Sequence, residues 1–187
     1  SVSLVTNYSN NIKWSNGDTI NKVTAKTTGT YSVEHTDANG CKNTSLSKNI
    51  TVFNNPATPV ITASGPLTFC AGGSVNLTSS VASNNKWSNG DSSNSIVAKA
   101  GGNYNVKVIN GNGCEAISQN VLVKVNALPQ VPTISMIGDT VFCAGDSLTL
   151  LSNVNHGIRW STGDTSATLI RKTSGTISLT YTDTNNC

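Results

Sequence analysis

The sequence KWSNGD at residues 86–91 decides the fold, because it recurs at a constant interval along the chain. KWSNGD also occupies residues 13–18, and the similar RWSTGD occupies residues 159–164, so that each copy lies 73 residues from the next. A self-comparison at this interval needs no gap anywhere in the 187 residues. The chain is therefore a tandem array of 73-residue repeats, a pattern to be identified before any fold is assigned.

The five cysteines follow the same interval. Cys41, Cys114 and Cys187 are 73 residues apart, and Cys70 and Cys143 are again 73 residues apart. In a chain without a catalytic motif, this cysteine content favours an oxidising compartment. The count is odd, so at least one cysteine is expected to pair with a cysteine outside this sequence.

Two short polar stretches that contain prolines, residues 54–59 and 127–132, are typical of linkers. We therefore place repeat 1 at residues 1–55, repeat 2 at residues 56–128 and repeat 3 at residues 129–187. In this phase only repeat 2 is complete. Repeat 1 is expected to lack its beginning and repeat 3 its last strand, as in a section of a longer array.

The composition excludes several classes of protein. Asn (25), Ser (24) and Thr (24) dominate, whereas charged residues make up 11% and aromatic residues 5% of the chain. This favours strands and turns over a helical bundle or a coiled coil. The net charge of +3 is spread thinly, so a nucleic-acid-binding groove is not expected. No apolar run approaches the roughly 20 residues that span a bilayer.

Within repeat 2, apolar and polar residues alternate at residues 74–78, 104–108 and 121–125, as they do in half-buried strands. Turn residues separate these segments, among them NGD at 89–91 and NGNG at 110–113. Six or seven short strands in about 70 residues predict an all-β fold of tandem immunoglobulin-like antiparallel β-sandwiches. The predicted core residues are Trp14, Trp87, Trp160, Leu77, Tyr104 and Val106.

The order of motifs in repeat 2 is CxGxxVxL at residues 70–77, WSNGD at 87–91, GxYxVxV at 102–108 and NGC at 112–114. This pattern covers the whole chain and resembles the tandem immunoglobulin-like repeats of large bacterial surface proteins. It is most similar to gliding-motility adhesins of the SprB type, which the type IX secretion system of Bacteroidota exports. Repeat 3 departs from the pattern at Ile177, where the other repeats have Tyr, and at Asn186, where they have Gly.

The resemblance implies an extracellular filament or stalk at the bacterial cell surface, with a role in adhesion and gliding motility. It implies as partners the neighbouring repeats of the same chain, lateral copies of the filament, a surface polysaccharide or substratum, and the outer-membrane motility or secretion machinery. Two alternatives are an array of glycan-binding modules and the accessory repeats of a secreted enzyme.

The residues themselves carry no sign of catalysis. His35 and His156 occupy different phases of the repeat, and no zinc-protease, serine-hydrolase or phosphate-loop motif occurs. The Asn-Gly-Asp turns could hold calcium, and so could the separate turn at residues 37–40. The counterparts of Asp37 are Asn110 and Asp183, so this position does not keep its charge, and ordinary turn chemistry is the preferred interpretation. We expect no enzyme activity, no metal and no cofactor. A Trp on the third strand of such a sandwich could stack on a sugar, yet it usually lies in the core.

The cysteines allow two pairings. One pairing joins Cys70 to Cys114 and Cys143 to Cys187, which would close each repeat on itself. The other pairing joins Cys70 to Cys187, because Cys70 and Cys114 are expected at opposite ends of a repeat and a disulfide spans Cα distances of only about 4.4–6.8 Å. The sequence leaves both pairings open.

Overall fold

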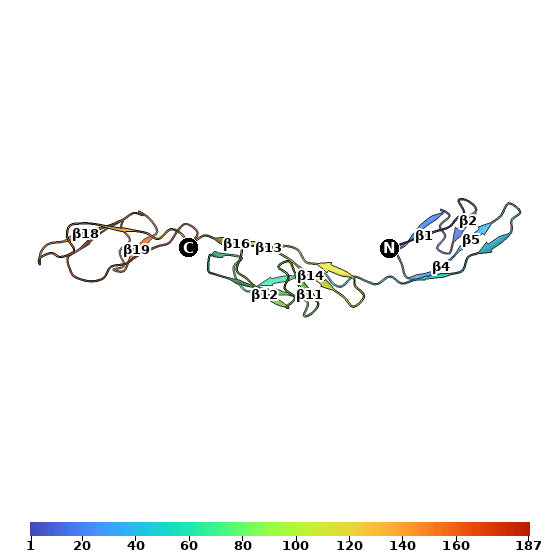
Figure 1. Cartoon of the computed structure of the whole chain (residues 1–187), viewed down its shortest axis with the longest axis horizontal. Helices are drawn as coiled ribbons and strands as arrows, with labels where there is room; N and C mark the ends of the chain where they lie inside the picture. Colours follow the sequence, from blue (N-terminus) through green and yellow to red (C-terminus); the bar gives the residue numbers. More distant parts are fainter. The chain divides into compact units, whose positions relative to one another are not determined.

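The computed structural model describes all 187 residues, and it consists of strands and irregular segments without any helix (Figure 1). No helix is therefore present that could cross a membrane. The chain divides into two compact units. Unit 1 comprises Ser1–Pro56 with Asn110–Glu115, and unit 2 comprises Ala57–Ile109 with Ala116–Cys187. Unit 1 thus contains repeat 1, and unit 2 contains repeat 3 and most of repeat 2.

Repeat 2 has nine strands in three sheets. The sheet orders are β12-β10-β8, β11-β14-β15 and β13-β16-β9. The strands are β8 (Ile61–Ala63), β9 (Thr68–Cys70), β10 (Val75–Ser79), β11 (Asn85–Trp87), β12 (Ser95–Ala98), β13 (Gly102–Tyr104), β14 (Val106–Ile109), β15 (Glu115–Ile117) and β16 (Val121–Asn126).

Repeats 1 and 3 keep most of these strands at the corresponding positions. Repeat 1 has sheets β1-β3, β2-β5-β6 and β4-β7, and repeat 3 has sheets β17-β18-β20 and β19-β21. The strands of repeat 1 are β1 (Val2–Val5), β2 (Ile12–Trp14), β3 (Lys22–Ala25), β4 (Gly29–Tyr31), β5 (Val33–Thr36), β6 (Lys42–Thr44) and β7 (Lys48–Ile50). Those of repeat 3 are β17 (Ile134–Ile137), β18 (Leu148–Ser152), β19 (Ile158–Trp160), β20 (Thr168–Arg171) and β21 (Leu179–Tyr181).

The core of repeat 2 follows from strand alternation. In β10, Val75 and Leu77 point inward, and they lie opposite Ala98 and Ile96 of β12 in the antiparallel register. Burial of each large apolar side chain contributes roughly 1.5–3 kcal/mol. The buried cluster consists of Val75, Leu77, Trp87, Ile96, Ala98, Val106 and Val123, with Tyr104 partly buried against it.

The segment 104–108, predicted as one strand, is divided between two sheets. β13 pairs with β16, whereas β14 pairs with β11, so the chain changes sheets at Asn105. At this point Asn105 is not paired within either sheet. Its carbonyl oxygen instead accepts a hydrogen bond from the backbone N–H of Ser88 at 2.9 Å. Tyr104 and Val106 therefore pack against the same core from two different sheets. Strand alternation predicts that both side chains face the core, but it does not show that they belong to different sheets.

β9 is one of the strands that the sequence analysis missed, as is β15. β9 runs parallel to β16, with Cys70 opposite Asn126, whereas β16 pairs antiparallel with β13 on its other side. Leu67 and Phe69 pack against the core from this edge. The fold is therefore all-β and of the sandwich type with mostly antiparallel pairs, as predicted, and the β9–β16 pair is a parallel addition.

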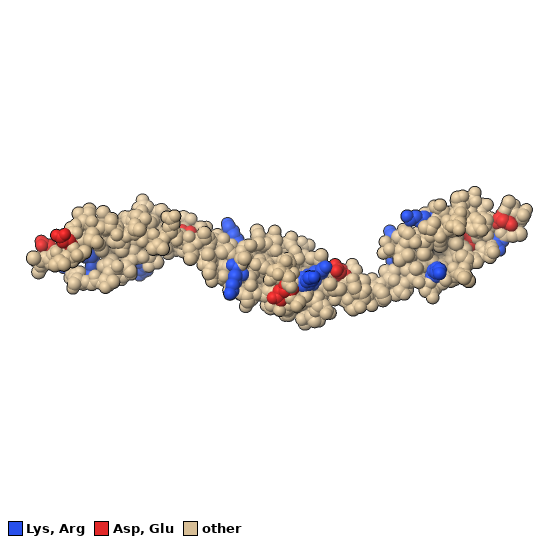
Figure 2. All heavy atoms as spheres, viewed as in Figure 1, with Lys and Arg blue, Asp and Glu red and all other residues tan.

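Charged groups contribute little to this fold. Figure 2 shows a few Lys, Arg, Asp and Glu side chains on a mostly uncharged surface. The ion pair between Lys42 Nζ and Glu34 Oε1 measures 2.8 Å, but the two side chains are 63% and 34% exposed. An exposed pair of this kind contributes about 0–1 kcal/mol, so the apolar cluster and the turns must account for the stability.

We expect Trp87→Ala to destabilise repeat 2 by about 3–5 kcal/mol, because it removes a large side chain that is only 2% exposed. Hydrogen exchange measured peptide by peptide should show lost protection in β10 to β16. Lys86→Ala on the same strand is the matched control, since Lys86 is exposed, and it should leave the protection unchanged. Equal exchange in the Trp87→Ala variant and the unmodified chain would contradict this account of the core.

Candidate functional site: the cysteine hairpin and its disulfide

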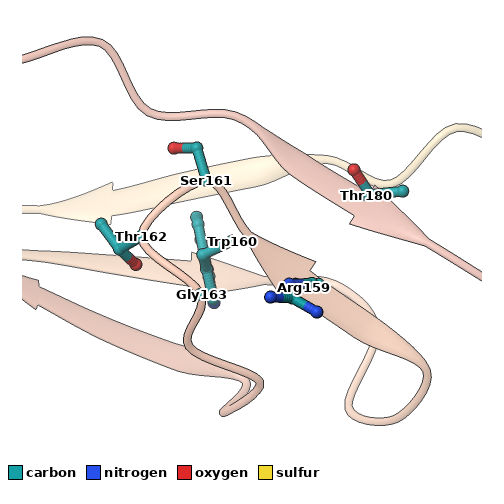
Figure 3. Close-up of a pocket in the computed structure, with 6 residues that line it drawn as sticks. All are labelled: Arg159, Trp160, Ser161, Thr162, Gly163 and Thr180. Carbon is teal, nitrogen blue, oxygen red and sulfur yellow. The ribbon is translucent and has the colours of Figure 1, made fainter.

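A pocket lies beside Trp160, one of the Trp residues that could stack on a sugar (Figure 3). Its volume is about 410 Å³, and it is lined by Arg159, Trp160, Ser161, Thr162, Gly163 and Thr180. Trp160 is only 1% exposed, however, so its ring faces are covered by protein. A sugar could not stack on this ring without displacing core side chains.

The indole nitrogen has the same partner type in every repeat. Trp160 donates to Ser166 O at 2.8 Å, Trp87 to Ser93 O at 2.8 Å, and Trp14 to Ile20 O at 2.9 Å. A buried indole N–H needs such an acceptor. Each Trp therefore fixes the loop six residues farther along the chain while its rings fill the core.

The Asp carboxylates of the WSNGD and WSTGD turns accept hydrogen bonds from backbone N–H groups of the same turns. Asp91 Oδ1 accepts the backbone N–H of Ser93 at 2.7 Å, and Asp164 Oδ1 accepts that of Ser166 at 2.7 Å. These backbone hydrogen bonds are the main reason that the pKa of each carboxyl lies below its ordinary value. No group of three or more His, Cys, Asp or Glu side chains comes together in a way that could hold a metal ion.

The two histidines contact tyrosines. The ring of His35 stacks on Tyr8 with a centroid distance of 3.8 Å, and His156 meets the edge of Tyr181 at 6.3 Å. Neither contact recurs in repeat 2, because the counterpart of His35 there is Val108 and that of His156 is Ser83. The histidines therefore form local aromatic contacts specific to their repeats.

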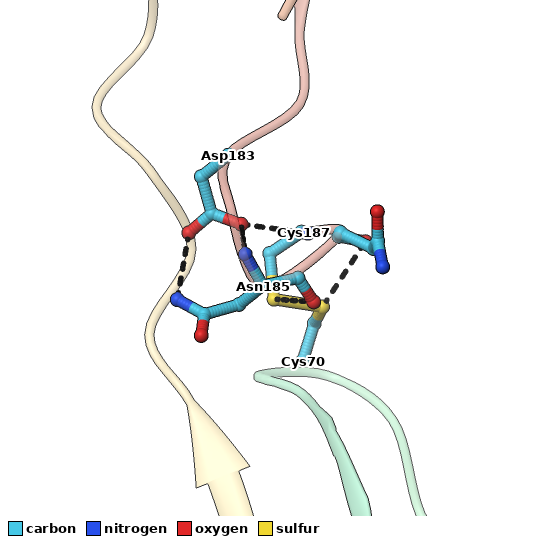
Figure 4. Close-up of a disulfide and its surroundings, with 5 residues drawn as sticks. Cys70, Asp183, Asn185 and Cys187 are labelled. Atoms are coloured by element: carbon cyan, nitrogen blue, oxygen red, sulfur yellow. Dashed lines mark hydrogen bonds between the residues drawn. A yellow bond between two sulfur atoms is a disulfide. The ribbon is translucent and has the colours of Figure 1, made fainter.

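The cysteines recur from repeat to repeat and are chemically reactive. A disulfide joins Cys70 to Cys187 (Figure 4). The Cα atoms are 5.5 Å apart, within the usual range for a disulfide, and the two residues are 117 positions apart. Cys70 belongs to repeat 2 and Cys187 to repeat 3, and both lie in unit 2. The bond therefore crosses the boundary between two consecutive repeats.

The within-repeat pairs Cys70–Cys114 and Cys143–Cys187 are not formed, and Cys41, Cys114 and Cys143 have free thiols. The reason is that Cys70 and Cys114 adjoin different linkers. Cys70 lies opposite Asn126, just before the linker that follows repeat 2. The Sγ atom of Cys114 lies 3.8 Å from Phe53 O, just before the linker that precedes repeat 2.

Asp183 positions Cys187 through a compact hairpin. Its Oδ1 accepts the backbone N–H groups of Asn185 at 2.8 Å and Cys187 at 2.9 Å, and its own N–H donates to Cys187 O at 3.0 Å. The hydrogen bond from the Cys187 amide is the largest cause that lowers the pKa of Asp183 below its ordinary value. The short loop therefore holds Cys187 where Cys70 can reach it.

The other two repeats build the same hairpin. In repeat 1, Asp37 Oδ1 accepts the N–H of Cys41 at 2.8 Å, and in repeat 2, Asn110 Oδ1 accepts the N–H of Cys114 at 3.0 Å. Since Asn serves as well as Asp, the hairpin requires an oxygen acceptor and not a charge.

The residue before each cysteine has a left-handed backbone. The φ angles are +82° at Gly40, +78° at Gly113 and +60° at Asn186. Gly and Asn are the residues that adopt this conformation at the lowest cost. The exchange of Gly for Asn in repeat 3 therefore preserves the hairpin, and with it the direction of the cysteine.

A second tight turn holds Cys70. The N–H of Ala71 donates to Asn126 O at 2.8 Å, and the N–H of Gly73 donates back to Cys70 O at 2.9 Å. Repeat 3 closes the matching turn with Asp146 N donating to Cys143 O at 3.1 Å. Both cysteines of the Cys70–Cys187 disulfide therefore lie in turns whose backbone hydrogen bonds recur in another repeat.

Comparison with protein-family models gave no match, and comparison with curated proteins gave none either. The interpretation of the site therefore depends on the chain's own residues.

The structure places the residues singled out from the sequence at two kinds of position. Trp14, Trp87, Trp160, Leu77 and Val106 are buried, and Tyr104 is half-buried. The cysteines lie in tight turns at the ends of strands. The turn acceptors Asp37, Asn110 and Asp183 were considered for calcium and not for the cysteine. Their constant place four residues before a cysteine was the signal that could have identified them.

Asp183→Ala should impair formation of the Cys70–Cys187 bond, because two backbone N–H groups of the hairpin lose their acceptor. Asp183→Asn should support it, as Asn110 supports the hairpin of repeat 2. The measurement is the oxidised fraction in a glutathione redox buffer. Asp139→Ala, at an exposed position of repeat 3, is the control; an equal loss in all three variants would contradict this role.

The same carboxylate should make repeat 3 sensitive to acid. Its folded-state pKa is lowered, so its stabilising effect is fully present above the ordinary value of 3.8 and is lost as the pH falls through the lowered pKa. Thermal unfolding of repeat 3 should therefore depend less on pH in Asp183→Asn than in the unmodified chain. An identical acid dependence would contradict this assignment.

Proposed function

We propose that this chain is a structural repeat segment of an extracellular filament or stalk that mediates adhesion and gliding at a bacterial cell surface. One observation carries the proposal: the disulfide joins repeat 2 to repeat 3 and does not close a single repeat. A cross-link within a repeat would stabilise an independent module. A cross-link between repeats stabilises a connection, which is what a force-bearing filament needs.

The position of the disulfide also changes the path of a pulling force. Tension applied between the two ends of the chain passes from Cys70 directly to Cys187. The strands from β10 to β21 lie between these cysteines in sequence, so they are outside the covalent path that bears the load. The part of repeat 2 that follows Cys70 and all of repeat 3 would then be protected from unfolding by tension, in keeping with a role in transmitting force.

Two further features support the proposal. A structural disulfide is typical of oxidising environments such as the cell exterior. The chain is rich in Asn, Ser and Thr and poor in charged residues. The roles in adhesion and gliding, secretion by the type IX system and the partners at the cell surface come from the resemblance of the repeat motifs to gliding adhesins.

Single-molecule extension tests the mechanical part. With the disulfide formed, only residues 1–70 can be stretched, which gives a contour length of about 240 Å at roughly 3.5 Å per residue. After reduction, the whole chain of 187 residues should extend to about 650 Å.

Cys70→Ser should show the long extension under oxidising conditions, because the cross-link cannot form. Cys143→Ser is the matched control, since Cys143 is a free thiol, and it should keep the short extension. A long extension of the oxidised, unmodified chain would overturn the proposed load path.

A further inference from the structure

Five Asn-Gly pairs occur in the chain, and the structure distinguishes one of them from the rest. An Asn that precedes Gly can lose its side-chain amide, because the backbone nitrogen of the Gly attacks the side-chain carbonyl carbon and no Cβ hinders its approach. A nitrogen whose N–H is already donated must first give up that hydrogen bond. The pairs are Asn16-Gly17, Asn39-Gly40, Asn89-Gly90, Asn110-Gly111 and Asn112-Gly113.

In four of these pairs, the N–H of the Gly donates to the carbonyl oxygen three residues earlier and so closes a turn. The donors are Gly17, Gly40, Gly90 and Gly113, with N···O distances of 2.8, 3.1, 2.9 and 2.9 Å. The N–H of Gly111 has no hydrogen-bond partner, and Gly111 is exposed. Gly111 is therefore the one Gly of the five whose nitrogen can attack without breaking a hydrogen bond.

The free N–H of Gly111 follows from the shape of the cysteine hairpin. Its counterparts are Ala38 in repeat 1 and Thr184 in repeat 3, and their N–H groups have no partner either. The hairpin of repeat 3 ends in the disulfide-bonded Cys187, whereas that of repeat 2 ends in the free thiol of Cys114. The nitrogen is therefore unpaired whether or not the cysteine of the hairpin is linked.

The side chain of Asn110 is held in a position that favours the attack. Its Oδ1 accepts the N–H groups of Asn112 and Cys114, both at 3.0 Å. The first of these bonds folds the side-chain carbonyl back over the Gly111 nitrogen, as in an Asx turn. Both donors also stabilise the negative charge that develops on Oδ1 when the nitrogen attacks. Asn16 and Asn89 have one such backbone donor each.

We propose that Asn110-Gly111 is a self-modification site, at which Asn110 is converted to aspartate or isoaspartate in the folded chain. The Gly111 nitrogen bonds to Cγ of Asn110, and the bond from Cγ to Nδ2 breaks. The amide leaves as ammonia, which takes up the proton that the Gly111 nitrogen gives up. Water then opens the cyclic imide at either of its two carbonyl carbons. The reaction consumes water, releases ammonia and leaves a carboxyl group.

The modification changes what the hairpin of repeat 2 can bind. Before it, Nδ2 of Asn110 donates to Asn54 O at 2.9 Å, which ties the hairpin to the stretch that precedes repeat 2. A carboxylate cannot donate this hydrogen bond, although it still accepts the N–H of the cysteine, as Asp37 and Asp183 do. Conversion to aspartate therefore keeps the hairpin and releases it from Asn54. This inference does not depend on the proposed function.

The first test incubates the 187-residue chain in a mildly alkaline buffer, with and without concentrated guanidinium chloride. Peptide mapping by mass spectrometry, with fragment spectra that separate Asn110 from Asn112, gives the rate of deamidation at each Asn. In the folded chain, Asn110 should react several-fold faster than each of the other four Asn that precede Gly. In denaturant the five rates should converge. Equal rates at all five positions of the folded chain would overturn the inference.

Gly111→Ala should slow the reaction of Asn110 several-fold, because the added Cβ hinders the approach of the nitrogen. The fold accommodates the substitution, since no atom lies within 4 Å of the Cβ position and the φ angle of Gly111 is not left-handed. Gly65→Ala, at an equally open position, is the matched control and should leave the rate unchanged. An undiminished rate in Gly111→Ala would exclude attack by this nitrogen.

Alkylation of Cys114 tests the release of the hairpin. The Sγ atom of Cys114 lies 3.8 Å from Phe53 O, next to the acceptor of the Asn110 amide. Asn110→Asp, which reproduces the aspartate product, should therefore raise the alkylation rate several-fold. Asn112→Asp is the matched control, because it adds the same charge to the hairpin while only its backbone N–H takes part in the turn. Equal rates in the two variants would overturn the proposed release.

Discussion

The bond between Cys70 and Cys187 constrains two small cores that would otherwise be separate. Repeat 2 has a buried cluster of seven side chains, and the cluster of repeat 3 has only three. Domains of about 70 residues bury a small share of their surface and are marginally stable. A cross-link across 117 positions is worth about 2–5 kcal/mol through the unfolded state, which is large beside such cores. The link between repeats is therefore also a source of stability for each of them.

That link depends on backbone geometry more than on particular side chains. The hairpin accepts Asp or Asn at its first position and Gly or Asn before its cysteine, since an oxygen acceptor and a left-handed φ are all that it requires. A calcium site would need the carboxylates that these exchanges remove. These exchanges therefore favour the interpretation of the hairpin as a structural turn over that of a calcium-binding loop.

The features that could be predicted from the sequence are those that depend on local residue patterns or on the 73-residue repeat. Strand alternation and the recurring Trp predicted an all-β fold, and the tendency of a third-strand Trp to be buried predicted where its ring would lie. The sequence could not separate the two disulfide pairings, because the choice depends on β9. That strand has three residues, its partner β16 is more than 50 positions away, and it runs parallel. A non-local pairing of this kind leaves no periodic signal, and neither does the change of sheet at Asn105.

The differences between repeats are as informative as their similarities. The exposed pair Glu34 and Lys42 of repeat 1 is replaced by Lys107 and Glu115 in repeat 2, so the signs are reversed at the same two positions. An array of identical ligand sites would keep its exposed chemistry constant. Here the exposed chemistry changes, whereas the buried Trp, the turns and the cysteines recur. The recurring residues therefore include those that build the joint between Cys70 and Cys187, whereas the charges at these two positions do not recur.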